Sequence, residues 1–550
     1  MAKAAESIVD VLGAGGVKRA YTVPGESFLG MLDGLEQSPD IQLISTRHES
    51  GASFMAEADA KMTGSPALVM ATRGVGAANL AIGVHTAQQD STPMVVILGQ
   101  VESEFIGREG FQEVDLTAFY GPITKLAVTA TRGDRLPELV ANGLRVARSG
   151  RPGPVMIAVP ADLFEDEVGV VAAATSLKVA SSPLMAPSIS SEAVVRALEL
   201  LRGASRPVLI EGGGARNSRA ELIELSERFG IGVYSSFRRQ DGFPNDHPNY
   251  LGHLGLGTPD VRLTALRKAD LVLVLGARLS EVTTQSYTLP AATSKIIQVD
   301  IDAAVLGAIV PTDLSIVSDC TLALRGILEA SKDFSTTRSW IAEHESYISW
   351  SSDGDTVLKD TEGVDPADVI GEMMRILPAD AVIANDAGNF AAFLHRYWRY
   401  RAPKSQLAPT SGAMGYAVPA AIGGGFAAPD RCVVGLAGDG GFLMTGMELE
   451  TAVRYNIPIT VVAFSNGIYG TIAMHQAHYK KRLAGVDIGR VDLAGFARSL
   501  GAESVRVDAI ADFGEALSAA VNSGKVNLIE VRTEPDLISP GKRLSEILRA

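Results

Sequence analysis

Short apolar runs of strand length alternate with amphipathic stretches of helical length over most of the chain. This alternation is typical of parallel β-sheets with helices on both faces. The most apolar runs, such as Pro93–Leu98 and Ile457–Phe464, are far shorter than the roughly 20 residues that span a membrane. Because one hydrophobic core does not grow to 550 residues, we expect several domains of this kind.

Two stretches interrupt the alternation and divide the chain. Ala172–Ser191 is rich in Ala, Ser and Pro and is predicted to be a linker. Ser331–Pro366 is polar, includes SSDGD and is predicted to be a second connection. The sequence therefore predicts three doubly wound α/β domains, at residues 1–171, 190–332 and 360–550, with a Rossmann-like domain in the middle.

Buried-strand patterns occur in all three segments. Those of the first segment are Arg19–Val23, Ile41–Ser45, Ala67–Thr72, Met94–Gly99 and Pro154–Val159. Those of the second are Pro207–Glu211, Leu271–Gly276 and Lys295–Asp300. Those of the third are Ala381–Asn385, Cys432–Ala437, Ile459–Ser465 and Leu528–Arg532.

A glycine cluster, Gly212–Gly214, follows the first strand of the middle segment. Such a turn can receive a dinucleotide pyrophosphate, but the full G-x-G-x-x-G spacing is missing. A tight turn without a ligand is at least as well supported.

The overall charge and the cysteines exclude several classes of protein. The formal net charge is −14, which disfavours nucleic acids and anionic membranes as partners. Cys320 and Cys432 alone cannot form a disulfide framework or a cysteine-based zinc site. The N-terminus shows no signal-peptide pattern, so we expect a soluble, cytoplasmic protein.

The stretch 435–470, GLAGDGGFLMTGMELETAVRYNIPITVVAFSNGIYG, is the most informative part of the sequence. One apolar strand, Cys432–Ala437, leads into Gly438-Asp439-Gly440-Gly441. A helix follows, and a second apolar strand ends at Asn466-Gly467. If the two strands are parallel neighbours, both side chains lie at the carboxyl edge of the sheet, where ligands bind. Carboxylate and amide oxygens suit Mg²⁺, and the glycines allow phosphate to approach backbone N–H groups.

This stretch resembles the thiamine diphosphate motif of the acetolactate synthase and pyruvate decarboxylase superfamily. The resemblance extends over nearly the whole chain and is closest to the acetolactate synthase large subunit. It implies thiamine diphosphate and Mg²⁺ as cofactors, with Asp439, Asn466 and the backbone carbonyl of Ile468 as metal ligands. The residues that it places at the diphosphate end of the cofactor are Asn389, Gly438, Gly440, Gly441, Tyr469 and Gly470.

Two further segments match the family and concern the pyrimidine ring of the cofactor. In TRHESGA, the resemblance makes Glu49 the acid that bonds this ring and promotes loss of the thiazolium C2 proton. The local alternative is an acid favoured at a helix start. In TSGAMG, the carbonyl of Gly412 is expected to hold the 4′-amino group, while Met414 supports the bent cofactor.

The substrate end is expected around residues of the first segment. Glu26 either relays protons or caps the turn after Pro24-Gly25. Phe111 and Gln112 resemble the family's FQE segment. Further expected substrate-side residues are Lys125, His85 and His475.

One departure bears on a third cofactor. After Gly276-Ala-Arg278 the chain reads Leu-Ser-Glu-Val-Thr-Thr-Gln, where flavin-binding synthases carry Phe-Asp-Asp-Arg. This segment disfavours FAD, which stays a possible third cofactor only as an alternative.

The favoured function is decarboxylation of a 2-oxo acid, with pyruvate preferred, followed by carboligation to a second carbonyl compound. The alternatives are a non-ligating decarboxylase, an acyltransferase, a hydroxy-ketone lyase, and a catalytically inactive regulatory paralogue. A flavin-linked oxidase is a further alternative. The resemblance also implies a homodimer or homotetramer, in which Glu49 of one chain meets the metal motif of another.

Overall fold

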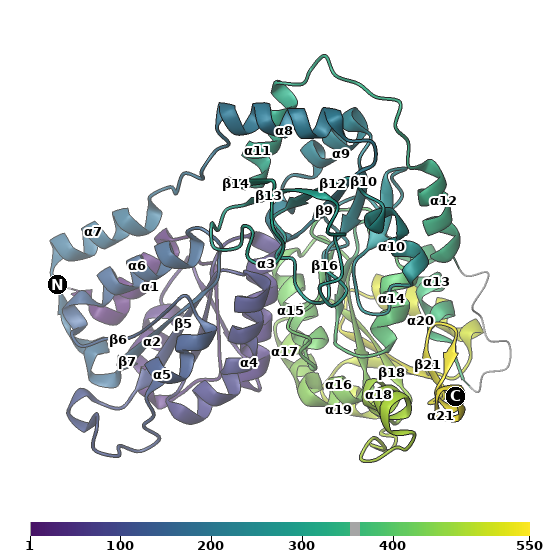
Figure 1. The fold of residues 1–550 in the computed structure, drawn as a ribbon. Helices are drawn as coiled ribbons and strands as arrows, with labels where there is room; N and C mark the ends of the chain where they lie inside the picture. The colour runs from purple at the N-terminus through teal and green to yellow at the C-terminus, as the bar shows by residue number, and fades with distance from the viewer. Residues whose placement is uncertain (1, 353–362) are drawn as a thin grey trace.

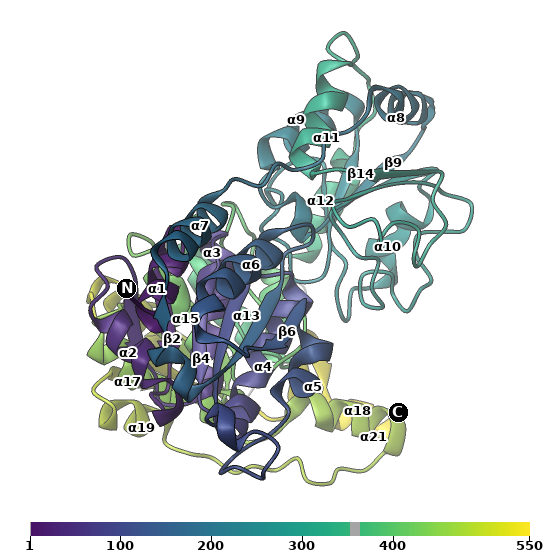
Figure 2. The ribbon, with the colours of Figure 1, turned by 90° about the vertical axis from the view of Figure 1, so that its left-hand side faces the viewer.

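The computed structural model of the protein describes residues 2–352 and 363–550. It contains three six-stranded sheets, each with all strands parallel and with helices packed around it (Figure 1). The predicted fold class is confirmed. Figure 2 shows that the middle sheet stands away from the other two, which lie together.

The first sheet has the order β3-β2-β4-β5-β7-β6. Its strands are β2 (Arg19–Thr22), β3 (Gln42–Ser45), β4 (Ala67–Ala71), β5 (Met94–Gln100), β6 (Leu126–Thr129) and β7 (Pro154–Pro160). Its main helices are α1 (Ala4–Ala14), α2 (Leu29–Glu36), α3 (Glu49–Thr63), α4 (Gly74–Asp90), α5 (Leu116–Tyr120) and α6 (Leu136–Arg148).

The middle sheet has the order β11-β10-β9-β12-β13-β14. Its strands are β9 (Pro207–Glu211), β10 (Gly232–Ser235), β11 (Tyr250–His253), β12 (Leu271–Leu275), β13 (Lys295–Asp300) and β14 (Leu314–Val317). Its helices are α8 (Ser191–Gly203), α9 (Arg219–Phe229), α10 (Asp260–Arg267) and α11 (Cys320–Glu329).

The third sheet has the order β16-β15-β17-β18-β20-β19. Its strands are β15 (Val382–Asn385), β16 (Gln406–Leu407), β17 (Val433–Gly438), β18 (Thr460–Ser465), β19 (Glu503–Val507) and β20 (Asn527–Arg532). Its helices include α13 (Pro366–Ile376), α14 (Phe390–Tyr397), α15 (Ala417–Ala427), α16 (Asp439–Thr445), α17 (Leu449–Arg454), α18 (Gly470–Lys480), α19 (Leu493–Ser499) and α20 (Ile510–Asn522).

The predicted linker at 172–191 is wrong in its first half. Helix α7 (Val170–Ser181) occupies it, and Ser176 and Ala180 are buried. Arg148 at the end of α6 donates a hydrogen bond to the carbonyl of Ala180 at 2.8 Å, which fixes the end of this helix. Alanine has the highest helix propensity, so a composition rich in Ala and Ser is compatible with a helix as well as with a linker.

The second predicted connection also contains regular structure. Helix α12 (Ile341–Trp350) lies within it, and the indole N–H of Trp340 donates to the carbonyl of Gly230. The rest of SSDGD and the expected start of the third domain at residue 360 fall outside the described residues. The domain limits themselves stay a proposal.

Helices α3 and α15 join the first and third sheets face to face. They share one apolar core, in which the rings of Phe54 and Tyr416 pack edge to face at 5.4 Å. A Cβ at Gly423 would lie only 2.3 Å from the carbonyl oxygen of Met55. The absence of a side chain at Gly423 therefore lets the two helices approach this closely.

Gly423→Ala is expected to destabilise the protein by about 1–3 kcal/mol, because the added methyl meets backbone that cannot move aside. The measurement is urea and thermal denaturation. Gly203→Ala is the matched control, because a Cβ there meets nothing within 4 Å. Equal stability of the two variants would contradict this account of the α3–α15 contact.

Candidate functional site

Asp439 and Asn466 lie side by side at the carboxyl ends of β17 and β18. The two strands are parallel neighbours, with Gly438 in register with Phe464. The Oδ2 atom of Asp439 accepts hydrogen bonds from the backbone N–H groups of Asn466 at 3.0 Å and Gly467 at 2.7 Å. Its Oδ1 accepts from Gly440 N–H at 2.9 Å. The carboxylate thus ties the two strand ends together.

Asp439 is 6% exposed, and burial raises the pKa of its carboxyl, against the opposing effect of the three N–H donors. The Oδ1 atom of Asn466 accepts from Ile468 N–H at 3.1 Å, which orients the amide. The carbonyl of Ile468 accepts from Gly470 N–H at 2.9 Å. The Asp439 carboxylate at the end of β17 therefore lies beside the turn after β18, which carries the Asn466 amide and the Ile468 carbonyl, and hard oxygen donors of this kind suit Mg²⁺.

The glycines of this turn are required by close packing. A Cβ at Gly440 would lie 2.6 Å from the ring of Tyr469, and one at Gly441 would lie 2.2 Å from Oδ2 of Asp386. Gly438 is the last residue of β17 and precedes the first turn of α16. Gly440 and Gly441 are buried, and Gly440 N–H already donates to Asp439, but a helix that begins directly after a strand is a common place for phosphate to bind.

Several buried polar atoms at this edge of the sheet have no hydrogen-bond partner among the described residues. They are Oδ1 of Asn385, Oδ2 of Asp386 and Oγ of Ser465. Burial raises the pKa of Asp386 to about 6, although its Oδ1 accepts from Ala417 N–H at 2.8 Å. Buried polar groups usually have partners, so a polar ligand at this edge could supply the missing partners of these three atoms.

Asn389 lies just before α14, beside the same edge. Its Oδ1 accepts from the hydroxyl of Thr471 at 3.0 Å, and its amide nitrogen approaches the sulfur of Met474 at 3.7 Å. Asn389 is thus held against α18, the helix that follows Gly470.

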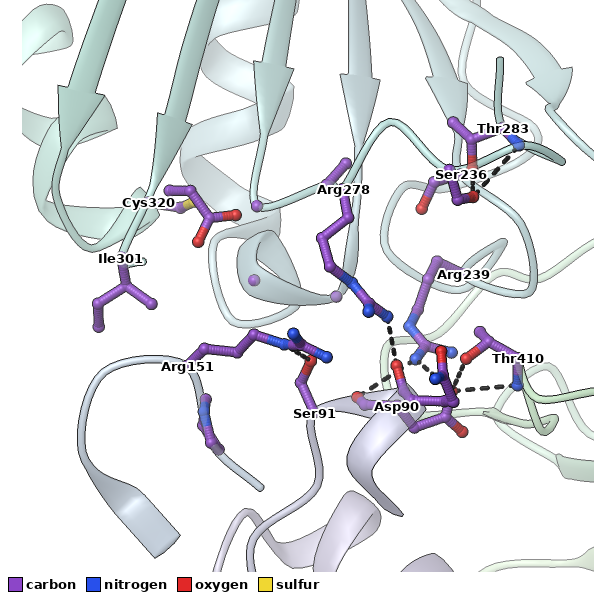
Figure 3. Close-up of a pocket in the computed structure, with 18 of the residues that line it drawn as sticks. Asp90, Ser91, Arg151, Ser236, Arg239, Arg278, Thr283, Ile301, Cys320 and Thr410 are labelled. Atoms are coloured by element: carbon purple, nitrogen blue, oxygen red, sulfur yellow. Dashed lines mark hydrogen bonds and ion pairs between the residues drawn. The ribbon is translucent and has the colours of Figure 1, made fainter. Parts of the chain in front are cut away.

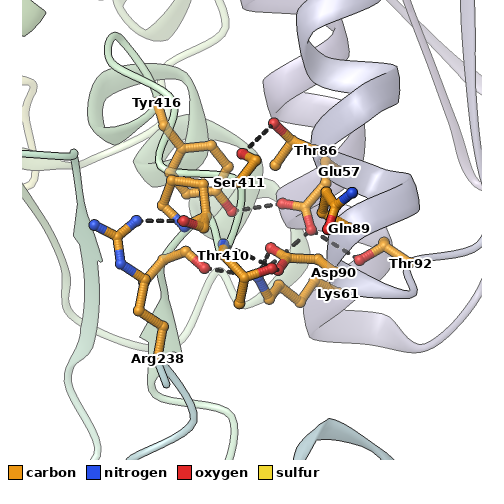
Figure 4. A network of polar contacts seen from close by, with 12 residues as sticks. Glu57, Lys61, Thr86, Gln89, Asp90, Thr92, Arg238, Thr410, Ser411 and Tyr416 are labelled. Atoms are coloured by element: carbon orange, nitrogen blue, oxygen red, sulfur yellow. Dashed lines mark hydrogen bonds and ion pairs between the residues drawn. The ribbon is translucent and has the colours of Figure 1, made fainter. Parts of the chain in front are cut away.

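The loop that carries Gly412 and Met414 is anchored at its start to helix α4. Thr410 N–H donates to Oδ1 of Asp90 at 3.1 Å, and the hydroxyls of Ser411 and Thr86 lie 2.9 Å apart (Figure 4). Gly412 has φ +72°, and a Cβ there would meet nothing within 4 Å. The backbone at Gly412 therefore faces open space, and Met414 beside it is half-buried.

Asp90 is the centre of a buried charge network between the three sheets (Figure 4). Its carboxylate pairs with Lys61 at 2.5 Å and with Arg239 at 3.0 Å, and these cations hold the pKa of Asp90 well below its usual range, against the effect of burial. Glu57 accepts from the hydroxyl of Tyr416 at 2.5 Å in the same network. These contacts, which sequence reasoning missed, fix the loop relative to the first segment.

Glu49 is the first residue of α3 and is half-buried. Its Oε2 accepts from the amide of Asn79 at 3.0 Å, and a Cβ at Gly76 would lie 3.2 Å from its Oε1. The turn before it is fixed by a residue of the third segment: the buried Glu448 accepts from His48 N–H at 2.9 Å and Arg47 N–H at 3.1 Å. Sequence reasoning missed Glu448, which lies within the GMELE stretch.

The expected substrate-side residues fall into two groups. Glu26 pairs with Arg73 at 3.1 Å, and Arg73 also reaches the carbonyl of Phe111 at 3.4 Å. Phe111 is 74% exposed, and the carbonyl of Gln112 accepts from Gly74 N–H at 3.1 Å. These residues gather around the start of α4, on the side where Gly76 approaches Glu49.

Lys125, His85 and His475 do not join that group in the described structure. The ammonium of Lys125 donates to the carbonyls of Val146 and Ser149, both at 2.6 Å, where it caps α6. His85 lies within α4, and His475 is exposed on α18, stacked near Tyr479. Helix capping accounts for Lys125 without a substrate.

A separate cavity of about 480 Å³ lies under the carboxyl ends of the middle sheet (Figure 3). Gly213, Gly214 and Gly276 line it, together with the cations Arg151, Arg239 and Arg278 and the acid Asp300. It lies near the point where the strand order reverses between β9 and β12, which is where nucleotides bind in open α/β sheets. The glycine turn therefore lines a cavity whose walls carry four arginines and an equal number of acids.

Comparison with known proteins agrees with this geometry. The N-terminal TPP binding domain of thiamine pyrophosphate enzymes matches residues 2–119, the central domain matches 194–327, and the C-terminal TPP binding domain matches 386–531. The chain is a member of the thiamine pyrophosphate enzyme family. It is therefore a thiamine-diphosphate-dependent enzyme, as the resemblance predicted.

The relatives include enzymes with different names. The chain is 31% identical to the probable acetolactate synthase large subunit of Methanocaldococcus jannaschii, over 100% of this chain and 95% of the relative. It is 30% identical to the sulfoacetaldehyde acetyltransferase of Castellaniella defragrans, over 98% and 94%. The solved structure of the Rhodococcus jostii thiamine diphosphate-dependent 4-hydroxybenzoylformate decarboxylase superposes with a TM-score of 0.86 at 25% identity, covering 97% of this chain and 99% of that one.

No helix within residues 2–352 and 363–550 has the length and apolar character needed to cross a membrane.

Proposed function

We propose that the carboxyl edge of the third sheet binds Mg²⁺ and the diphosphate of thiamine diphosphate. The observation that carries this proposal is the juxtaposition of Asp439 with Asn466 across the ends of β17 and β18. Asp439, Asn466 and the carbonyl of Ile468 are the proposed metal ligands. The unpartnered oxygens nearby and the glycine turn support a polar, phosphorylated ligand.

The remaining cofactor contacts follow from the loops around this edge. Gly412 and Met414 are proposed to receive the pyrimidine end, because the backbone at Gly412 faces open space and the loop is held to Asp90. Asn389, Tyr469 and Gly470 complete the diphosphate end. When bound, thiamine diphosphate supplies a carbon nucleophile for 2-oxo acids. Glu49 is proposed to hold a proton at its pyrimidine ring, positioned by Asn79 and by the turn that Glu448 fixes.

The proposed reaction is decarboxylation of a 2-oxo acid, with pyruvate favoured, and ligation to a second carbonyl compound. The acetolactate synthase relatives support ligation, whereas the acetyltransferase and the decarboxylase support an acyltransferase or a simple decarboxylase as alternatives. The joint presence of Glu49, Asp439 and Asn466 argues against an inactive paralogue.

We expect the purified protein with Mg²⁺ and thiamine diphosphate to release CO2 from at least one acid in a panel of 2-oxo acids. Glu49→Gln keeps the shape of the side chain but removes the acid, so it should bind the cofactor and lose activity by about 100-fold or more. Mass spectrometry of the products, with pyruvate alone and with added aldehydes, separates ligation from simple decarboxylation. Full turnover by Glu49→Gln would remove this acid from the proposal.

We also propose a homodimer in which Glu49 of one chain faces the metal residues of the other. In the described part of one chain, the hydrogen bond that Glu49 accepts comes from Asn79, not from the metal edge. Exposed apolar side chains lie on the helices next to Glu49 and next to the metal residues. They are Val75 and Ile82 on α4, Met444 on α16 and Ile472 on α18. Burial of these faces against a second copy would stabilise the pair.

Mixing two inactive variants tests this arrangement. Glu49→Gln and Asp439→Asn chains, unfolded and reassembled together, should regain roughly a quarter of the wild-type activity, because each mixed dimer contains one intact site. Each variant alone is the control. No recovery from the mixture, with dimers confirmed by sedimentation, would place both residues in a site within one chain.

We propose that the cavity of the middle sheet binds the pyrophosphate of a dinucleotide, for which FAD is one candidate. Its glycine turn and the cations Arg151 and Arg278 suit a pyrophosphate, and Asp300 stands at a strand end, where an acid can bond a ribose. A flavin absorption band in the purified protein would identify FAD. Adenine nucleotide without flavin in the denatured supernatant would exclude FAD while supporting the site, and absence of both would contradict it.

A further inference from the structure

Arg73 lies at the turn between β4 and α4, on the same side of the first sheet as Glu49. Gly76 follows three residues later. A Cβ at Gly76 would lie 3.2 Å from Oε1 of Glu49 and 3.2 Å from the methyl carbon of Thr72. The hydroxyl of Thr72 lies 2.8 Å from that of Ser27, next to Glu26. The turns after β2 and β4 therefore place the Arg73–Glu26 pair beside the proposed catalytic acid.

The guanidinium of Arg73 is mostly withdrawn from water but only partly paired. Its side chain is 13% exposed, whereas that of Glu26 is 69% exposed. Its Nη1 atom meets Glu26 at 3.1 Å and the carbonyl of Phe111 at 3.4 Å, and its buried Nε has no partner among the described residues. A poorly hydrated cation with free donors is well suited to receive a carboxylate or sulfonate.

The surroundings hold Arg73 in this position. Gln112 has φ +63°, and its carbonyl accepts from Gly74 N–H, so the segment that supplies the Phe111 carbonyl is fixed against the start of α4. Glu26 is held less firmly, because an ion pair of a mostly exposed carboxylate contributes little. An incoming anion can therefore replace Glu26 while Arg73 remains in place.

The charge also indicates which substrate Arg73 serves. A cation that stabilises the carboxylate of the donor would favour the ground state over the transition state that loses CO2, and would slow decarboxylation. An anionic group on the acceptor keeps its charge throughout the reaction and meets no such penalty.

We propose that Arg73 is a specificity-determining residue that binds the anionic group of the carbonyl acceptor. This inference rests on the ligation reaction proposed above. The enzyme then prefers an acceptor that carries a carboxylate or sulfonate over a neutral aldehyde. Glu26 occupies Arg73 until that acceptor arrives.

The first test is a competition between an anionic acceptor, a second molecule of pyruvate, and neutral acetaldehyde. Arg73→Gln should shift the product ratio toward the neutral acceptor by about tenfold or more, while CO2 release from the donor changes less than about threefold. Arg132→Gln, which removes an exposed arginine of the same segment, is the matched control and should leave the ratio unchanged. An unchanged ratio in Arg73→Gln, or an equal loss of donor turnover, would overturn the proposal.

A second readout does not depend on turnover. Binding of oxamate, an unreactive anion, is compared with binding of neutral oxamide by calorimetry, in wild type and in Arg73→Gln. The wild type should bind oxamate more tightly than oxamide, and Arg73→Gln should lose that preference. An equal preference in both proteins would overturn the proposal. This result does not require that the enzyme release CO2, so it is separate from the test of the proposed reaction. Should Arg73→Gln not fold, Arg73→Lys keeps the charge without the planar fork and should lie between the two.

Discussion

The parallel pairing of β17 with β18 is the constraint on which the proposed chemistry depends. It brings two strand ends to one edge, and the Asp439 carboxylate links them by accepting N–H groups from the second strand's turn. Antiparallel pairing would have placed these residues at opposite ends of the sheet. Positions 440 and 441 must be glycine in this arrangement, because a Cβ at Gly440 would collide with Tyr469 and one at Gly441 with Asp386.

A second edge, at the start of α3 and α4, bears the groups proposed to act on the pyrimidine ring and the substrate. Its geometry is not local to the first segment. Glu448 fixes the turn before Glu49, and Asp90 at the far end of α4 holds the loop that carries Gly412. The two sheets thus position parts of each other's sites.

Hydrophobic patterns in the sequence predicted those features that depend on neighbouring residues in the chain. The strands with the clearest apolar runs, the fold class and the proximity of Asp439 to Asn466 follow from those runs and from the strand–helix–strand connection. The buried strands β10, β11 and β16 were not predicted, because each is only two to four residues long. The Asp90–Thr410 and Glu448–His48 contacts did not, because they join residues hundreds of positions apart and leave no periodic signal. Helix α7 was missed because an Ala- and Ser-rich stretch suits a helix and a linker equally well.

The tight crossing of α3 and α15 has a consequence for biosynthesis. The first segment leaves the ribosome with the apolar face of α3 complete, yet its cover, α15, ends only at Ala427. At ordinary elongation rates that face waits roughly 20–70 s for its partner. During this interval the nascent chain exposes the apolar face of α3 to water, where it can associate with other apolar surfaces.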